Sequence, residues 1–366
     1  MSIIWADFPS GQQGLYGSSY ADMLNGIWGA WEGNTGNTIL VDDPDATIGS
    51  AGKVLRATSN TTTLSGARFP LPGGATTTVG VGLRLYMSAL PSGNWGTWHG
   101  PLIGYRTIAN ASVCYLTVLS NGAIAVATGS GGTTLLGTTG TPVVTANAWN
   151  HIEMKVTRDA AAGVCEVRVN GVTVLNLTGL ALGATDTAQI FLGSQAWNFN
   201  NLNRGLNYFK DLVIWDNLGS HGNDFQGSVS VRDLATDADV SLNWTPSTGS
   251  TGWDILDNVP ANDTIYIAAG DPPPSPADFG LTDLPVDVTS VRALLPIART
   301  WKTDGGDCNI QMSLTPNGVD WDAGADRPVT TAPTYWWDVS HVSPDTAAPW
   351  TPAEVNNANL RIDRTL

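Results

Sequence analysis

One stretch, "CEVRVNGVTVLN" at 165–176, constrains the fold most. In it, Cys165, Val167 and Val169 alternate with polar residues, which is the period of a strand that buries one face. Asn170-Gly171 interrupts this alternation, and both residue types tolerate the positive φ of a type I′ turn. The sequence therefore predicts a tight β-hairpin here.

The two-residue turn also predicts the register of this hairpin. Val169 should lie opposite Val172 and Val167 opposite Val174, so that all four valines share one face. The preceding strand candidate, 150–157, has the same period of two. The charged and polar side chains between the apolar positions are expected to be scaffold on a solvated outward face; they are His151, Glu153, Glu166 and Arg168.

Strand candidates of this kind recur along the whole chain. Charged residues make up only 13% of the sequence, and 41 Gly and 21 Pro supply turns, so a β-rich protein is expected. Short strands with regular turn signals are typical of a sandwich or jelly roll. The candidates are 53–58, 64–69, 78–87, 100–106, 112–119, 122–128, 133–136, 150–157, 164–170, 172–177, 188–193 and 208–215.

The chain is predicted to contain two β-domains. An irregular segment, 1–50, is expected to pack on or anchor the first domain, 51–218, and a boundary near 216–226 precedes the second domain, 224–366. One short helix is expected after Thr351 as N-cap, because Pro352 and Glu354 complete a capping box. Strands of the second domain are predicted at 228–234, 239–244, 264–268, 289–299, 307–315 and 358–364, with an Asn-Gly turn at 317–318.

Charge and hydropathy exclude several classes of function. The net charge is −15, of which residues 1–220 carry −2 and residues 221–366 carry −13, and this balance argues against nucleic-acid binding. No window of 18 apolar residues occurs, so membrane insertion is not expected. The first residues lack a basic region followed by an apolar core, which predicts synthesis in a cytoplasm without a signal peptide.

Three cysteines, Cys114, Cys165 and Cys308, lie far apart in the sequence. Their odd number and spacing exclude a disulfide framework and a zinc site. Cys114 and Cys165 occupy inward strand positions and are predicted to be small core residues.

Three segments carry a resemblance to a known fold. "AWNHIEMKVTRDAAAGVCEVRVNGVTVLNL", "AQIFLGSQ" and "NYFKDLVIWDN" resemble the concanavalin A-like jelly roll of laminin-G type, over about 50–217. The resemblance implies an all-β jelly-roll sandwich for this part of the chain, and together with the predicted domain boundary it gives the expected fold class, a jelly roll plus a second, smaller β-sandwich domain. It implies little about function, because this fold hosts lectins, glycosidases, adhesion modules and structural parts.

A second resemblance spans nearly the whole chain. "DFPSGQQGLYG", "MLNG", "DFQGSVSVRDL", "WDILDNVPANDTIYI" and "PWTPAEVNNANL" are similar to segments of virion proteins of tailed bacteriophages, a group of tail, fibre and head-associated components. This similarity implies a place on the virion surface, with other virion proteins as partners. Such a protein is expected to form homo-oligomers.

The acidic residues are weak candidates for chemistry. A glycosidase needs two carboxylates facing one cleft, yet the chain has only four Glu and none has an acid two residues away. No catalytic residue is therefore expected. Two Asp-rich stretches are either turns or candidate calcium sites; they contain Asp42, Asp43 and Asp45, and Asp320, Asp322 and Asp326.

Tryptophan is unusually abundant, with 15 residues against 8 Tyr and 7 Phe. Its flat apolar face and single N–H suit stacking on a sugar ring or anchoring an interface, and they equally suit a core. The candidates for glycan or partner contact are Trp95, Trp98, His99, Trp197, Asn198, Trp336 and Trp337.

These observations favour a non-enzymatic structural or adhesive protein of a phage-like particle. It would be displayed as a fibre, spike or capsid decoration, with host-surface polysaccharide as a candidate ligand for host attachment. The alternatives are a carbohydrate-active enzyme such as a polysaccharide depolymerase, or a free lectin module on the same fold. No cofactor is expected other than the candidate calcium.

Overall fold

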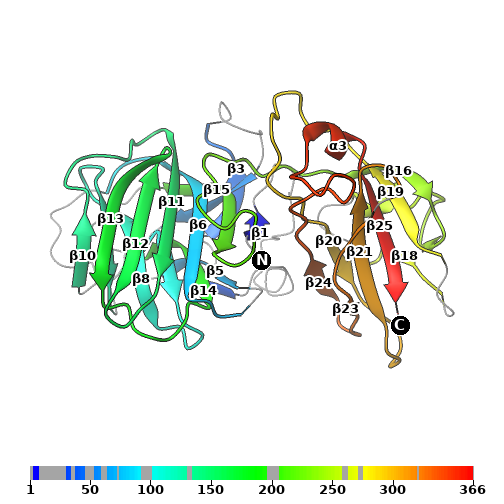
Figure 1. Cartoon of the computed structure of the whole chain (residues 1–366), viewed down its shortest axis with the longest axis horizontal. Helices are drawn as coiled ribbons and strands as arrows, with labels where there is room; N and C mark the ends of the chain where they lie inside the picture. Colours follow the sequence, from blue (N-terminus) through cyan, green and yellow to red (C-terminus); the bar gives the residue numbers. More distant parts are fainter. Residues whose placement is uncertain are drawn as a thin grey trace. The chain divides into compact units, whose positions relative to one another are not determined.

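A computed structural model describes most of the chain (Figure 1). The chain divides into two compact units, 1–232 and 233–366. Within the described part, no helix is long and apolar enough to cross a membrane. The described residues are 3–7, 30–33, 38–45, 53–58, 64–71, 74–91, 101–129, 134–195, 206–257, 263–270, 275–319 and 321–365.

The first unit is built from two antiparallel sheets, which we call the first and the second sheet. In order across it, the first sheet contains β13 (Val172–Leu180), β12 (Gly163–Val169), β11 (Trp149–Thr157), β6 (Thr78–Met87), β15 (Leu206–Asp216), β4 (Lys53–Thr58) and β3 (Thr38–Asp42), with β1 (Ile3–Asp7) also paired to β15 (Figure 1). The second sheet contains β10 (Thr134–Thr138), β9 (Ile124–Thr128), β8 (Ser112–Val118), β7 (Ile103–Arg106), β14 (Gln189–Gln195), β5 (Leu64–Pro70) and β2 (Ala30–Gly33).

The core lies between these two sheets. Alternate residues of β6 and β11, among them Leu83, Leu85 and Met154, are fully buried on the inward face of the first sheet. Tyr105 from the second sheet donates its hydroxyl to the Met154 carbonyl at 2.5 Å, which ties the two layers together. The all-β jelly-roll sandwich that the sequence predicts is confirmed.

The predicted hairpin of β12 and β13 is confirmed, but part of its register is wrong. Asn170 and Gly171 have φ values of 50° and 81°, and Val169 pairs with Val172 as expected. A β-bulge between Val167 and Arg168 then sets Val167 opposite Leu175 instead of Val174. In addition, β13 is the edge strand of its sheet, so its first residue is 65% exposed. The four valines therefore do not form one buried face.

The segment expected to be irregular, 1–50, contributes strands to both sheets. Its strands β1 and β3 belong to the first sheet, and β2 extends the second sheet beyond β5. β2 and β3 end their sheets, and β1 pairs with part of the interior strand β15. Such short strands need little local alternation, because strand formation depends strongly on the neighbouring strands.

The second unit is a smaller β-domain. Its main sheet contains β16 (Thr236–Ser241), β19 (Ala277–Leu281), β25 (Asn359–Thr365), β21 (Asn309–Thr315), β22 (Asp322–Ala323) and β23 (Arg327–Pro328). Two further pairs of strands form two-stranded ribbons. One ribbon pairs β17 (Thr245–Pro246) with β18 (Ile267–Ala268), and the other pairs β20 (Ile297–Thr300) with β24 (Thr334–Trp337). The helices are α2 (Trp253–Leu256) and α3 (Pro352–Asn356).

In the second unit, the predicted helix cap is confirmed, whereas several predicted strands are absent or shorter. The capping box of α3 is confirmed, since the Thr351 hydroxyl accepts from the Glu354 N–H while the Glu354 carboxylate accepts from the Thr351 N–H. The strand predicted at 228–234 is wrong, because that segment has no strand partner and its groups bond to side chains of the first sheet. The strands predicted at 264–268 and 289–299 shrink to β18 and β20.

The core positions predicted for two cysteines are confirmed. Cys114 and Cys165 are fully buried, whereas Cys308 is half-buried, and all three are free thiols. Burial raises the pKa of the Cys114 thiol to about 12 and the pKa of Cys165 well above its ordinary value.

Candidate functional site

The outward face of the first sheet carries a row of side chains paired directly across four strands. Tyr208 of β15 lies opposite Arg56 of β4 on one side and opposite Tyr86 of β6 on the other, and Tyr86 lies opposite Trp149 of β11. Directly paired residues of an antiparallel sheet point to the same face with Cβ atoms about 4.5–5.5 Å apart. These four residues, which we call the aromatic row, therefore form one continuous strip.

The three rings of the aromatic row pack on one another. The ring centroids of Tyr86 and Trp149 are 5.6 Å apart, and those of Tyr86 and Tyr208 are 5.7 Å apart with an interplanar angle of 82°. Trp149 is buried and donates its indole N–H to the Asp45 carbonyl at 3.0 Å. Tyr86 and Tyr208 are only half-buried, so solvent reaches both phenol rings.

A second row of polar residues follows the aromatic row along the same face, with Lys210, Arg84 and His151 paired across β15, β6 and β11. The Lys210 ammonium lies 2.5 Å from the Asp43 carboxylate, both side chains are buried, and the ammonium sits 4.2 Å above the Trp149 ring. This ion pair and the cation–π contact hold the Trp149 end of the aromatic row in place.

A bulge in β15 places a carboxylate on this face beside Arg84. Asp211 has a φ of 54°, and the register between β15 and β6 shifts between Lys210 and Val213. The bulge turns the Asp211 side chain outward, where it accepts from the Arg84 guanidinium at 2.9 Å. Burial raises the pKa of Asp211, while the N–H of Val231 and the charge of Arg84 oppose that rise.

His151 is a buried, neutral base in this second row. Only 2% of the residue is exposed, and neither ring nitrogen has a hydrogen-bond partner among the described residues. Burial, and then the charge of Arg84, lower its pKa to about 4. The scaffold role expected for His151 fits its position, but the side chain is not solvated.

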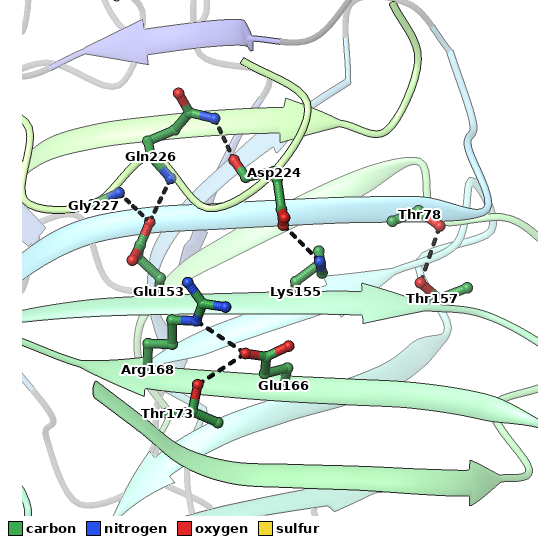
Figure 2. A network of polar contacts seen from close by, with 10 residues as sticks. All are labelled: Thr78, Glu153, Lys155, Thr157, Glu166, Arg168, Thr173, Asp224, Gln226 and Gly227. Atoms are coloured by element: carbon green, nitrogen blue, oxygen red, sulfur yellow. Dashed lines mark hydrogen bonds and ion pairs between the residues drawn. The ribbon is translucent and has the colours of Figure 1, made fainter. Parts of the chain in front are cut away.

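A segment that follows β15 covers the opposite end of the same face. This segment, residues 224–231, which we call the strap, is fixed to β11 by Glu153 (Figure 2). One carboxylate oxygen of Glu153 accepts from the N–H groups of Gln226 at 2.8 Å and Gly227 at 2.9 Å. The solvated position expected for Glu153 is therefore wrong, because only 1% of the residue is exposed beneath the strap.

Aromatic and ionic contacts secure the strap further. Phe225 packs edge-on against Trp215 at 6.0 Å, and the Arg168 guanidinium lies 3.6 Å above the Phe225 ring. The Lys155 ammonium lies 2.6 Å from the Asp224 carboxylate, and Figure 2 draws this ion pair. Within the described residues, no strap residue bonds to the aromatic row, so that row is the part of the outward face that the strap leaves open.

Two buried carboxylates on this face are already engaged. Glu153 binds main-chain N–H groups of the strap, and Asp211 accepts from the Val231 N–H at 2.9 Å in addition to Arg84. Burial also raises the pKa of Glu153, against the lowering effect of the Gly227 and Gln226 N–H groups. Their contacts are those of groups that hold the strap on the sheet.

Several predicted site residues lie outside the described residues: Trp95, Trp98, His99, Trp197, Asn198 and Asp320. Of the others, Trp336 packs against the core of the second unit, while the adjacent Trp337 projects to the other face of the β20–β24 ribbon, opposite Ile297. Strand alternation thus separates the two tryptophans, and a glycan or partner contact by Trp337 stays a prediction.

Of the candidate calcium residues, the Asp43 and Asp326 side chains contact other groups, while Asp42 and Asp322 are placed only by their strands. Asp42 belongs to β3, Asp43 pairs with Lys210, and the Asp45 N–H donates to Asp43 at 2.9 Å. In the second unit, Asp322 is half-buried in β22 and Asp326 accepts from the Thr365 hydroxyl. No group of three or more His, Cys, Asp or Glu side chains able to hold a metal ion occurs in the described part of the chain.

The aromatic row is a functional candidate that the sequence alone does not reveal. Strand alternation places Tyr86 outward in the segment 78–87 and Tyr208 outward in 208–215, so the orientation of each follows from its own strand. Their pairing with each other and with Arg56 depends on the order of strands that are far apart in sequence. Local patterns do not determine that order.

No family model and no curated protein matches the chain. Among solved structures, the catalytic domain of a glycoside hydrolase family 131 protein from Coprinopsis cinerea is 14% identical, with a TM-score of 0.38, over 64% of this chain and 99% of that one. An alginate lyase from Chlorella virus is 13% identical, with a TM-score of 0.37, over 52% of this chain and 93% of that one.

A carbohydrate-binding module, CBM66 from Bacillus subtilis, is 8% identical, with a TM-score of 0.30, over 51% of this chain and 95% of that one. The names of these three neighbours are those of carbohydrate-active enzymes and a carbohydrate-binding module, and none is a phage virion protein. Likeness at this level supports no conclusion about function, so the function proposed for this chain rests on the geometry of the aromatic row.

Proposed function

We propose that this chain is a non-enzymatic, glycan-binding protein whose binding surface is the aromatic row. The observation that carries the proposal is the strip of in-register side chains, in which Tyr86 and Tyr208 stay half-exposed. Aromatic rings offer flat apolar faces to the C–H faces of sugars, and adjacent polar groups bond to sugar hydroxyls. The sheet, the Lys210–Asp43 ion pair and the edge-on ring contacts fix these groups before ligand binds.

Binding without cleavage is proposed because of the state of the carboxylates. Glycoside hydrolysis requires an acid and a base or nucleophile facing the same sugar. On this face, Glu153 and Asp211 instead accept hydrogen bonds from the main chain of the strap. The competing proposal, a depolymerase, would require one of these carboxylates to leave the strap.

The experiment compares binding to a panel of polysaccharides with the appearance of new reducing ends in the same samples. Tyr208→Ala and Tyr86→Ala should each weaken binding about 2- to 10-fold, which corresponds to the roughly 0.5–1.5 kcal/mol of one aromatic contact. Tyr266→Ala is the matched control, because Tyr266 is a 39% exposed tyrosine of the second unit. Equal binding by all three variants would refute the aromatic row as the site, and new reducing ends would favour an enzyme.

We also propose, as a second element of function, that the protein is a surface component of a tailed phage or phage-like particle, such as a fibre, spike or capsid decoration. The support is the resemblance of the sequence to virion proteins, so other virion proteins and copies of the same chain are the proposed partners. The protein should then co-purify with particles in fixed stoichiometry, and absence from purified particles would refute this placement.

A further inference from the structure

We infer that the ligand of the aromatic row is an acidic glycan whose sugar carboxylate is bound by Arg56. This inference rests on the proposed function and names the class of sugar for the same site. It comes from the distribution of ion pairs over the outward face of the first sheet.

Every other cationic side chain described on that face has a carboxylate partner. Arg84 pairs with Asp211 at 2.9 Å, and the same face holds the pairs Lys210–Asp43 at 2.5 Å, Lys155–Asp224 at 2.6 Å and Arg168–Glu166 at 2.9 Å. Arg56 differs, because it has no hydrogen-bond or ion-pair partner within the described part of the chain and its Nε is buried.

An unpaired guanidinium that is half-buried in a sheet is costly unless something binds it. Its fork of N–H donors matches the two oxygens of a carboxylate, with which arginine forms paired hydrogen bonds. Among the side chains that the structure describes on this face, one cationic group is thus left unmatched, and that group lies at the end of the aromatic row.

The position of Arg56 beside Tyr208 defines how such a sugar would lie. The two residues are direct partners between β4 and β15, so their Cβ atoms are about 4.5–5.5 Å apart. A sugar ring stacked on the Tyr208 phenol therefore lies within reach of the guanidinium through a carboxylate on that ring. Tyr86, next in the row, is placed to contact the neighbouring sugar.

The test uses two carboxylated polymers, polygalacturonate and hyaluronan, each beside its carboxyl-reduced counterpart, which keeps the backbone and removes the charge. The wild-type protein should bind at least one acidic polymer about tenfold or more tightly than its reduced form, as expected for a charged hydrogen bond. Arg56→Gln should abolish this preference, and Arg56→Lys should keep only part of it. Arg292→Gln is the control, since it removes one exposed positive charge from the second unit.

Each result separates this inference from the proposed function. Equal affinity for acidic and reduced polymers, with binding still lost in Tyr208→Ala, would overturn the carboxylate inference and leave glycan binding in place. Equal losses in Arg56→Gln and Arg292→Gln would assign the preference to overall charge and would also overturn it. Failure of both acidic polymers to bind overturns it too, while the wider polysaccharide panel decides whether glycan binding itself stands.

Discussion

The contact between Glu153 and the strap allows a prediction with a defined magnitude. Glu153→Ala removes the acceptor of two main-chain N–H groups, those of Gln226 and Gly227, and the first of these is buried. A buried donor left unpaired costs about 1–3 kcal/mol, and water that enters the space vacated by the side chain offsets part of this. We expect the strap to lose about 2 kcal/mol, a roughly 30-fold increase in its opening equilibrium.

Glu153→Gln separates hydrogen bonding from charge. The amide keeps a carbonyl oxygen that can accept from both N–H groups, but it carries no charge to bury. Because burial raises the pKa of Glu153 in the folded protein, the ionised form opposes folding. The glutamine variant should therefore hold the strap at least as well as the wild type at neutral pH.

The raised pKa also fixes the sign of the pH dependence. Below the ordinary value of 4.5, the carboxyl is protonated in both the folded and unfolded states, and its stabilising contribution is complete. As the pH rises through the folded-state pKa, that contribution is lost. Strap stability in the wild type should fall over this range, and Glu153→Gln should not show the fall.

Amide hydrogen exchange of a peptide containing 224–231 measures these effects directly, after correction for the intrinsic exchange rate at each pH. A peptide containing α3, in the second unit, is the internal control and should not change. Equal loss of protection at pH 7 in Glu153→Gln and Glu153→Ala would refute this account, because the charge itself would then hold the strap.

Three further predictions concern packing, thiols and capping. Gly80→Ala should lower the free energy of unfolding of the first unit by about 1–3 kcal/mol, because the added Cβ would lie 2.0 Å from the Trp215 indole. Gly104→Ala is the control, since its Cβ would meet only ordinary van der Waals contacts. In a denaturant titration it should cost much less than Gly80→Ala. A thiol reagent should label only Cys308 in the native protein and all three cysteines after unfolding; rapid labelling of a second native thiol would contradict the burial described. Thr351→Ala should cost the second unit about 1 kcal/mol, and an unchanged melting temperature of that unit would show that the capping box adds nothing to it.

The sequence predicts the strands of the first unit well because each buries one face and therefore alternates. The predicted ranges 53–58 and 78–87 coincide with β4 and β6, and the residues of 112–119 and 150–157 lie within one or two positions of β8 and β11. The capping box of α3 is predictable for a related reason, since all its contacts lie within four residues.

The strap and the aromatic row could not be predicted, because both depend on contacts distant in sequence. The stretch "SVSVRDL" alternates like a strand, yet the Val231 N–H bonds to Asp211, twenty residues earlier. Strand alternation places Glu153 on the outward face, where a solvated side chain is expected. Its carboxylate instead accepts from main-chain N–H groups more than seventy residues later. A local sequence pattern indicates which face of a strand a side chain occupies, but it does not indicate which distant segment covers that face.

The strap has a mechanical consequence, because it is the last part of the first unit before the second unit begins at residue 233. A pulling force applied through the second unit would reach the Asp211–Val231 and Arg84–Ser228 contacts before it reached β15. These bonds would detach one after another, while β15 stays held in the sheet by β6 and β4. Under such a force, the strap would detach from the sheet and extend by its own length. The sandwich that carries the aromatic row would remain folded during this first extension.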